Sequence, residues 1–369
     1  MKSLLFIMPS LKGGGAEKVL IDLFRHLPDD KYNVSLLIAD FNGVYVNQIP
    51  ENVEVIKLPQ PTGLIASALL RVKPLRNLVW RTNIRKAIGC RKFDAIISFC
   101  EGGSTIYHSF IMDNGVRNIS WVHMNLALNN WCSFMFGKDA VSKEKQIYSR
   151  MDSIVFVSDG AKESFRELFG ITDGLHTIYN VIDRDLICSR ADEFNVEKRK
   201  FTVCNIGRLD YQKRQDRLLE VTSILKKRGL DFEVWILGIG KWEDKLRNLA
   251  RELGVEDCVK FLGFQTNPYP YLKASDVFLL TSDTEGYPTV VCESLCLGKP
   301  VISTSITGSE ELLKDGVGVL TSYDVNEIAD SVEVLMNNPL LLKKYSSAAE
   351  EKAKSFNPSE IIKQIDDLI

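Results

Sequence analysis

Apolar and polar positions follow two recurring patterns along the whole chain. Short runs rich in Val, Ile, Leu and Phe are typical of buried strands, and the longer segments between them have the apolar spacing of amphipathic helices. This alternation predicts parallel sheets built from β–α–β units. The predicted strands of the first half are Ser3–Met8, Val34–Ala39, Val53–Leu58, Ala95–Phe99, Asn118–His123, Ile154–Val157 and Thr177–Tyr179. Those of the second half are Phe201–Ile206, Glu233–Leu237, Val259–Leu262, Val277–Leu280, Val301–Ser303 and Val317–Leu320.

A polar stretch between these halves predicts a linker. It follows Asn180-Val181-Ile182-Asp183 and continues to Lys200. A chain of 369 residues is long enough for two domains that each bury a core. We therefore expect an α/β fold with an N-terminal Rossmann-like domain over 1–182 and a C-terminal one over 183–369. The last helix is a candidate to cross back to the first domain. Since ligands of open α/β sheets bind at the carboxyl ends of the strands, we expect the two sheets to face each other across a cleft.

Composition limits the class of protein. Hydrophobic residues make up 45% and charged residues 25%, as in a soluble enzyme and unlike a disordered chain. No apolar run is long enough to span a membrane, and Met1–Met8 lacks the cleavage site of a signal peptide. The cysteines form no CxxC pair, which indicates reduced thiols and a cytoplasmic location. No histidine has the spacing of a metal ligand, so no metal site is expected.

Charge is shared unevenly between the halves. Residues 1–182 hold 21 Lys and Arg against 17 Asp and Glu, and the rest holds 25 against 31, which gives +4 and −6. The excess lies mainly in the stretch Arg71–Lys92, which contains no acidic residue. Its apolar positions include Leu75, Leu78, Val79, Trp80, Ile84 and Ile88.

This basic stretch has two interpretations. One is a helix lying on an anionic membrane surface, and the other is a core-facing helix with a solvated basic face. A second apolar segment, Trp131–Phe136, could touch lipid or a lipid-linked acceptor. Under the first interpretation the protein lies peripherally at the inner face of the membrane, and no nucleic-acid partner is expected under either.

A glycine cluster follows the first predicted strand. Gly13-Gly14-Gly15 opens a helix, where backbone amides could approach a phosphate or a sugar. The alternative is an ordinary tight turn. A dinucleotide fingerprint is incomplete because Lys18 stands where its third glycine should be, although Asp40 would suit a ribose.

Two glutamates flank a predicted helix start in the second half. Glu285 lies in a loop after the strand Val277–Leu280, and Pro288 is predicted as the first helical residue. Glu293 then lies inside the helix, so the two carboxylates stand on the order of 10 Å apart. This spacing exceeds the roughly 5 Å of a retaining glycosidase pair, and it suits one carboxylate on a sugar and the other on a ribose. The alternatives are a solvated loop acid and an exposed helical one.

Arg208, Lys213 and His123 are further candidates because each follows a predicted strand. Arg208 can hold phosphate oxygens through its planar fork, and Lys213 adds a point charge. The alternative is a pair of surface cations. His123 ends the strand Asn118–His123, where a rim or core histidine is the alternative.

Three motifs together resemble the retaining glycosyltransferases of the GT-B fold, a large family of bacterial group 1 enzymes that use sugar nucleotides. They are Gly14-Gly15-x-Glu17, Gly207-Arg208-Leu209 with Lys213, and Glu285 with Glu293. The resemblance covers nearly the whole chain in the same order, and it implies that the domain over 1–182 is the acceptor side and that the domain over 183–369 binds the nucleotide sugar. The aromatic that often follows the Glu-Gly pair is here Tyr287-Pro288, which leaves the choice of donor open.

The resemblance implies a role for each candidate. Gly14 and Gly15 would approach the donor, and Arg208 and Lys213 would hold its diphosphate with the amides of Thr289 and Val290. Glu285 would bind the transferred sugar, Glu293 the ribose, and His123 the sugar or the acceptor. Glu285, His123, Arg208 and Lys213 are thus the expected catalytic residues.

The implied reaction moves a hexose or N-acetylhexosamine from a UDP-linked donor to a glycan or lipid-linked acceptor. It would retain the anomeric configuration and use neither metal nor cofactor. Three alternatives stay open: a sugar-nucleotide epimerase on the same scaffold, a non-catalytic nucleotide-sugar-binding protein, and a dinucleotide oxidoreductase.

Overall fold

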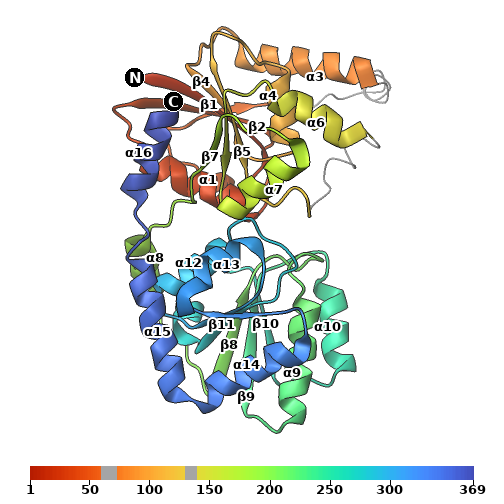
Figure 1. Cartoon of the computed structure of the whole chain (residues 1–369), viewed down its shortest axis with the longest axis vertical. Helices are drawn as coiled ribbons and strands as arrows, with labels where there is room; N and C mark the ends of the chain where they lie inside the picture. Colours follow the sequence, from red (N-terminus) through yellow and green to blue (C-terminus); the bar gives the residue numbers. More distant parts are fainter. Residues whose placement is uncertain (60–72, 129–138) are drawn as a thin grey trace. The chain divides into compact units, whose positions relative to one another are not determined.

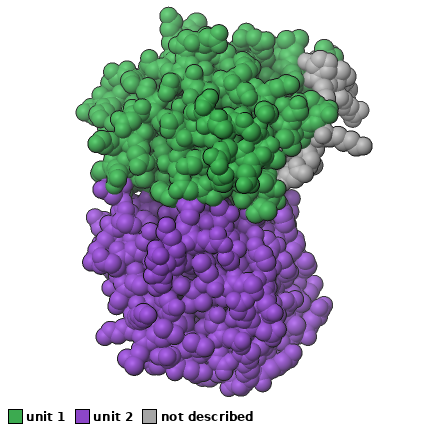
Figure 2. Space-filling model, viewed as in Figure 1, with its two compact units in different colours: residues 1–181, 358–369 green, residues 182–357 purple. Residues whose placement is uncertain are grey.

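The chain forms two compact α/β units. The computed structural model describes residues 1–59, 73–128 and 139–369 (Figure 1). The first unit comprises Met1–Val181 and Pro358–Ile369, and the second comprises Ile182–Asn357; they are green and purple in Figure 2. Among the described helices, none combines the length and apolarity needed to cross a membrane.

Unit 1 is built on a parallel sheet. In the described residues its strands are β1 (Lys2–Ser10), β2 (Tyr32–Asp40), β3 (Glu54–Lys57), β4 (Ala95–Ser98), β5 (Arg117–Val122), β6 (Ser153–Phe156) and β7 (Leu175–Thr177). They lie in the order β3-β2-β1-β4-β5-β6-β7. The helices are α1 (Gly15–His26), η1 (Val46–Gln48), α3 (Lys73–Ile88), α4 (Gly103–Ser109), α6 (Ala140–Tyr148), α7 (Asp159–Phe169) and α16 (Pro358–Leu368).

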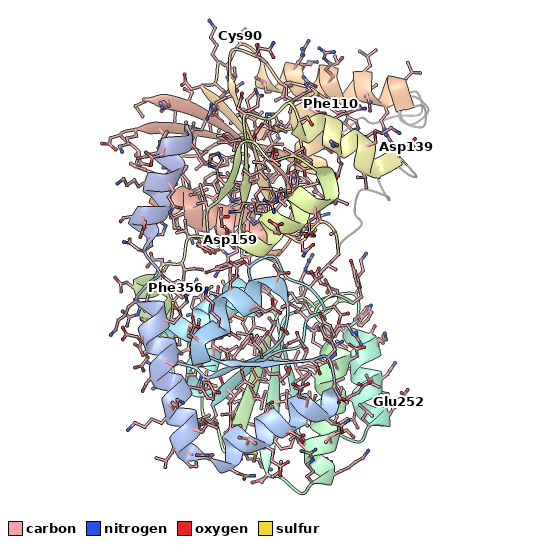
Figure 3. All side chains as sticks on the ribbon, in the orientation of Figure 1. Cys90, Phe110, Asp139, Asp159, Glu252 and Phe356 are labelled. Atoms are coloured by element: carbon pink, nitrogen blue, oxygen red, sulfur yellow. The ribbon has the colours of Figure 1, made fainter. Side chains whose placement is uncertain are left out.

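Unit 2 repeats this plan. Its strands are β8 (Phe201–Ile206), β9 (Phe232–Leu237), β10 (Val259–Gly263), β11 (Val277–Leu280), β12 (Val301–Thr304) and β13 (Val319–Thr321), in the order β10-β9-β8-β11-β12-β13. The helices are α8 (Arg184–Ala191), α9 (Gln215–Lys227), α10 (Glu243–Glu252), α11 (Tyr269–Ala274), α12 (Thr289–Cys296), α13 (Thr307–Leu313), η3 (Lys314–Gly316), α14 (Val325–Asn337) and α15 (Pro339–Ala353). Phe356, labelled in Figure 3, lies between α15 and α16 and packs against the core of unit 2.

Successive strand residues face opposite sides of each sheet, and helices bury both sides. In β1, Leu5 and Ile7 join a core with residues of α3 and α4, while Phe6 packs edge-on against Phe24 of α1. In unit 2, Val203 belongs to the core formed with α9 and α14, and the next residue, Cys204, belongs to the core formed with α8 and α12. The near-continuous apolar runs of the sequence follow from this two-sided burial.

Two predicted strands are displaced from their observed positions. β7 covers Leu175–Thr177 where Thr177–Tyr179 was expected, and β13 covers Val319–Thr321 where Val317–Leu320 was expected. Both are three-residue strands at the end of their sheet, with one neighbour each. A strand with one neighbour is buried less completely, so its hydrophobic pattern locates it less well.

Candidate active site

The switch point of each sheet brings two turns together. In unit 2 the chain fills one side of β8 with β9 and β10 and then crosses to β11, so the turns after β8 and β11 are adjacent at the carboxyl edge. In unit 1 the turns after β1 and β4 are adjacent in the same way. Ligands of open α/β sheets bind at such points.

Lys213 and Glu285 meet at the switch point of unit 2. The Lys213 ammonium lies 2.5 Å from Oε1 of Glu285, and the side chains are only 17% and 12% exposed. The Ser282 hydroxyl donates to the same carboxylate oxygen over 2.8 Å. A partly desolvated pair of this kind costs free energy when one partner is removed, because the other charge is left without its counterion.

A network of backbone and side-chain bonds fastens the two turns to each other. The Asp283 amide donates to the Gln212 carbonyl, and the Gln212 side chain donates to the Thr284 carbonyl over 2.9 Å. The Asp283 carboxylate accepts from Arg214 at 3.0 Å and from the buried Arg217 at 2.8 Å. The position of Asp283 in the sequence does not predict that it joins the two turns.

Arg208 lies at the same edge of the sheet but is more exposed to solvent than Lys213. Its side chain is 56% exposed, and its Nε atom lies 3.6 Å from Asp210. The exposure is compatible with either interpretation of Arg208, a surface cation or a phosphate ligand.

Helix α12 begins one residue later than predicted. Pro288 has φ −72° and ψ 100°, an extended conformation, and caps a helix that starts at Thr289. Thr289 and Val290 are therefore its first two residues, and their amides belong to the helix N-terminus, where i−4 acceptors are missing. Gly308 of α13 lies close to the turn that precedes α12, since a Cβ atom on Gly308 would lie 2.6 Å from the Gly286 carbonyl oxygen.

Glu293 is buried within α12. It is 3% exposed, and the Tyr269 hydroxyl lies 3.5 Å from its Oε1 atom. The alternative of an exposed helical glutamate is therefore wrong, because a carboxylate this enclosed is kept only with polar partners. Glu285 is likewise no freely solvated loop acid, given its pairing with Lys213.

The glycine turn of unit 1 holds a carboxylate of its own chain. Gly14 caps α1, which begins at Gly15, and the amides of Gly13 and Gly14 donate to Glu17 over 2.5 and 2.8 Å. In this structure, two of the amides predicted to approach a ligand thus already have an acceptor. A Cβ atom on Gly15 would meet nothing within 4 Å, so the helix start itself is open.

His123 follows β5, which ends at Val122, one residue earlier than predicted. Its amide donates to Glu101 over 2.8 Å, and its ring lies 4.8 Å from that of Phe99. Burial lowers the pKa of His123 to about 3, so the imidazole is neutral at physiological pH. A neutral ring can bind hydroxyls but offers no charge to a phosphate.

Most of the basic stretch forms helix α3, which has one buried face and one exposed face. Ile84 is fully buried, and Trp80 packs against Tyr107 with 5.3 Å between ring centroids. Leu75 and Leu78 are 40% and 60% exposed, and the exposed cations Arg81, Arg85 and Lys86 lie on the same helix. Trp80, Ile84 and Ile88 pack inward, as the interpretation of a core-facing helix requires. Arg71 and Trp131–Phe136 lie outside the described residues.

Comparison with known proteins assigns the chain to a family. The model of group 1 glycosyl transferases matches residues 190–354, and that of glycosyltransferase family 4 matches residues 13–186. The chain is 32% identical to N-acetylgalactosamine-N,N'-diacetylbacillosaminyl-diphospho-undecaprenol 4-alpha-N-acetylgalactosaminyltransferase of Campylobacter jejuni, over 98% of this chain and 97% of the relative. The chain belongs to the group 1 glycosyltransferases.

Solved structures share the fold of this group 1 glycosyltransferase. The Anabaena protein Alr3699/HepE, in complex with UDP and glucose, gives a TM-score of 0.80 at 21% identity, covering 100% of this chain and 99% of that one. Sucrose-phosphate synthase of Thermosynechococcus elongatus gives 0.80 at 15% identity, covering 100% and 98%. These structures confirm the two predicted Rossmann-like, GT-B-type domains. The family assignment confirms that the enzyme is a glycosyltransferase, and the epimerase and the non-catalytic binding protein are not favoured.

Sequence reasoning missed the turn after β9 in this glycosyltransferase. Gly238, Ile239 and Gly240 follow β9 directly, and the Leu209 amide donates to the Ile239 carbonyl over 3.0 Å. A Cβ atom at 238 would lie 1.9 Å from the Gly207 carbonyl oxygen, and one at 240 would lie 2.2 Å from that of Leu209. The Gly-x-Gly spacing was the available signal, because only glycine allows the turn bearing Arg208 to approach so closely.

Gly238→Ala tests this close approach. We expect it to lower the free energy of unfolding by about 3 kcal/mol and to weaken nucleotide binding, because φ is +138° and the added methyl meets backbone. Urea unfolding and isothermal titration calorimetry with UDP measure the two effects.

The matched control is Gly229→Ala, where φ is also positive at +77° but a Cβ atom meets nothing within 4 Å. It should cost only about 1–2 kcal/mol and leave UDP binding intact. Equal effects of the two substitutions on UDP binding would show that the contact with Gly207 does not shape the site.

Proposed function

We propose that this enzyme transfers a hexose or N-acetylhexosamine from a UDP-linked donor to a glycan or lipid-linked acceptor, with retention and without a metal. The observation that carries the proposal is the Lys213–Glu285 pair at the switch point of unit 2, with Arg208 on the same turn as Lys213 and Glu293 buried in α12. Cations for a diphosphate and carboxylates for sugar and ribose hydroxyls then lie along one sheet edge.

The names of similar proteins support the donor and acceptor classes. The Campylobacter relative is named for transfer of α-N-acetylgalactosamine to a diphospho-undecaprenol-linked sugar. The HepE crystals contained UDP with glucose, or UDP-glucose. A structure of Staphylococcus aureus TarM, similar at a TM-score of 0.79 and 14% identity, contained UDP and alpha-GlcNAc-glycerol.

The ion pair places two charges useful for donor binding side by side. The Lys213 ammonium is available to a diphosphate oxygen, and the Glu285 carboxylate can accept hydrogen bonds from hydroxyls of the transferred sugar. Because the two side chains are paired, neither charge lies in this partly buried place without a counterion.

The reaction breaks the bond from the anomeric carbon to the diphosphate and forms one to the acceptor oxygen. The acceptor's proton passes to the departing diphosphate oxygen on the same face of the sugar. Negative charge grows on the diphosphate, and Arg208, Lys213 and the α12 amides of Thr289 and Val290 stabilise it. Gly14 and Gly15 are proposed to approach the donor from unit 1, and His123 to contact a sugar hydroxyl.

Metal independence is part of the proposal. In residues 1–59, 73–128 and 139–369, no three His, Cys, Asp or Glu side chains gather as a metal-binding group would. Activity in the presence of a chelator tests this point directly.

The two glutamates should have separable roles. Glu285→Gln should lower kcat strongly and leave the affinity for free UDP nearly unchanged, since its hydroxyl contact strengthens in the transition state. Glu293→Gln should weaken UDP binding as well. Steady-state kinetics and calorimetry with UDP measure these effects, and equal losses of UDP affinity would reject the assignment.

Arg208→Ala should lower kcat by roughly 10²–10³, or about 3–4 kcal/mol, because a preorganised donor to the leaving diphosphate is lost. Arg208→Lys should recover part of the rate, since an ammonium cannot reproduce the planar fork. Lys213→Ala should resemble Arg208→Ala. Kinetics in chelator-containing buffer measure these changes.

Arg251→Ala is the control, because Arg251 is 61% exposed on α10 and pairs with Glu256 over 3.6 Å. Its kcat should match the wild type. If Arg208→Ala also stays within a few-fold of the wild type, or if chelator abolishes activity, another group carries the charge.

We also propose that the exposed face of α3 contacts anionic membrane, because two exposed leucines and three exposed cations lie on this helix. Arg81→Glu with Arg85→Glu should weaken binding to phosphatidylglycerol vesicles by at least roughly 30-fold at low salt, at about 1 kcal/mol per lost cation. Vesicle co-sedimentation measures it. Lys162→Glu with Arg166→Glu on α7 is the charge-matched control, and equal losses in both variants would contradict a specific α3 surface.

A further inference from the structure

The turn after β4 lies beside the glycine turn of β1, at the switch point of unit 1. It runs through Phe99, Cys100, Glu101 and Gly102 before α4 begins at Gly103. Gly102 has φ 72° and ψ −113°, which is accessible to glycine and strained for other residues. A Cβ atom on Gly103 would lie 3.2 Å from Pro9. The two glycines therefore fix the direction in which Glu101 leaves the sheet.

This turn holds His123 from two sides. His123 lies just beyond the end of β5, where its amide has left the strand pairing, and the Glu101 carboxylate accepts that amide over 2.8 Å. The imidazole lies against Phe99, which is 1% exposed, with 4.8 Å between ring centroids. Residues two positions apart on one turn thus anchor both the backbone and the ring of His123.

The Nε2 atom of the His123 ring is the second feature of this residue that bears on ligand binding. Among the described residues, Nε2 is buried and has no hydrogen-bond partner. A buried nitrogen without a partner is unfavourable, and such atoms are usually satisfied by a ligand or a water. A ligand hydroxyl would satisfy it.

The surroundings of Glu101 set it apart from an ordinary surface acid. Burial raises the pKa of the Glu101 carboxyl, and the negative charge of Glu144 on α6 acts in the same direction. A carboxyl group kept in these surroundings needs a compensating contact, and the His123 amide provides one.

We infer that Glu101 is a positioning residue of the transfer reaction: its carboxylate fixes His123 so that Nε2 meets a hydroxyl of the bound sugar or acceptor. The inference depends on the proposed function for the identity of the ligand. The anchoring of His123 by Glu101 does not depend on it.

A double-mutant cycle tests the inference. Glu101→Ala should lower kcat about tenfold, the loss expected for one hydrogen bond in the transition state, with little change in UDP affinity. Glu101→Gln should stay within about threefold of the wild type, because its amide oxygen still accepts from the His123 amide. In a His123→Ala background, Glu101→Ala should change kcat less than about twofold, since residues acting through one contact are not additive.

Glu163→Ala, an exposed acid on α7 of the same unit, is the control and should leave kcat unchanged. A full tenfold loss from Glu101→Ala in the His123→Ala background would overturn the inference, because Glu101 would then act by itself. A Glu101→Gln variant as impaired as Glu101→Ala would overturn it too.

Nuclear magnetic resonance separates the inference from the proposed function. The chain has four histidines, so the ring signals of His123 in labelled protein are identified by their absence in His123→Ala. Without any ligand, Glu101→Ala should shift or broaden these signals, and Glu101→Gln should restore them. Unchanged signals in Glu101→Ala would refute the anchoring, whereas intact anchoring in a protein that transfers no sugar would refute only the proposed function.

Discussion

Parallel strand pairing is the constraint on which both candidate sites depend. Because every observed strand pair is parallel, all turns that follow strands emerge at one edge of their sheet. The chain then fills each sheet outward from its first strand in two directions, which leaves adjacent turns at β1 and β4 and at β8 and β11. Residues about 70 positions apart, such as Lys213 and Glu285, meet without any long loop. The candidate residues Lys213 and Glu285 thus lie where the sheet order reverses.

Charge compensation keeps these turns in place. The segment after β8 supplies Lys213, Arg214 and Arg217, and the segment after β11 supplies Asp283 and Glu285 as their partners. Arg214 adopts a left-handed conformation with φ 52° at the start of α9, which is unfavourable for a side chain with a Cβ atom. Its bonds to Asp216 and Asp283 stabilise that conformation. The same ion pairs therefore shape the backbone and hold the side chains of the candidate site.

Much of the architecture could be predicted from sequence because strands buried on both faces leave continuous apolar runs. The pattern failed where burial is incomplete, at the edge strands β7 and β13. Lys213 and Glu285 could be assigned to one rim because both follow strands, whereas their direct pairing depends on backbone turns that no spacing rule describes. Glu101 was overlooked although Gly102 and Gly103 follow it, since a single acid after a strand carries little information before its neighbour His123 is placed. The burial of Glu293 could not be predicted from the sequence either, because glutamate in a helix is usually exposed.

The assignment of α16 to unit 1 has a consequence for synthesis of the protein. Tyr32 donates to Asp366, and Arg117 donates to the Leu368 carbonyl over 3.1 Å, so residues made after unit 2 complete the packing of unit 1. Unit 2 is one uninterrupted segment, Ile182–Asn357, and has all its contacts available once that segment has left the ribosome. Unit 1 lacks its contacts with α16, including the bond from Tyr32 to Asp366, until Pro358–Ile369 has been made. The half of the enzyme that is made first is thus the half whose packing is completed last.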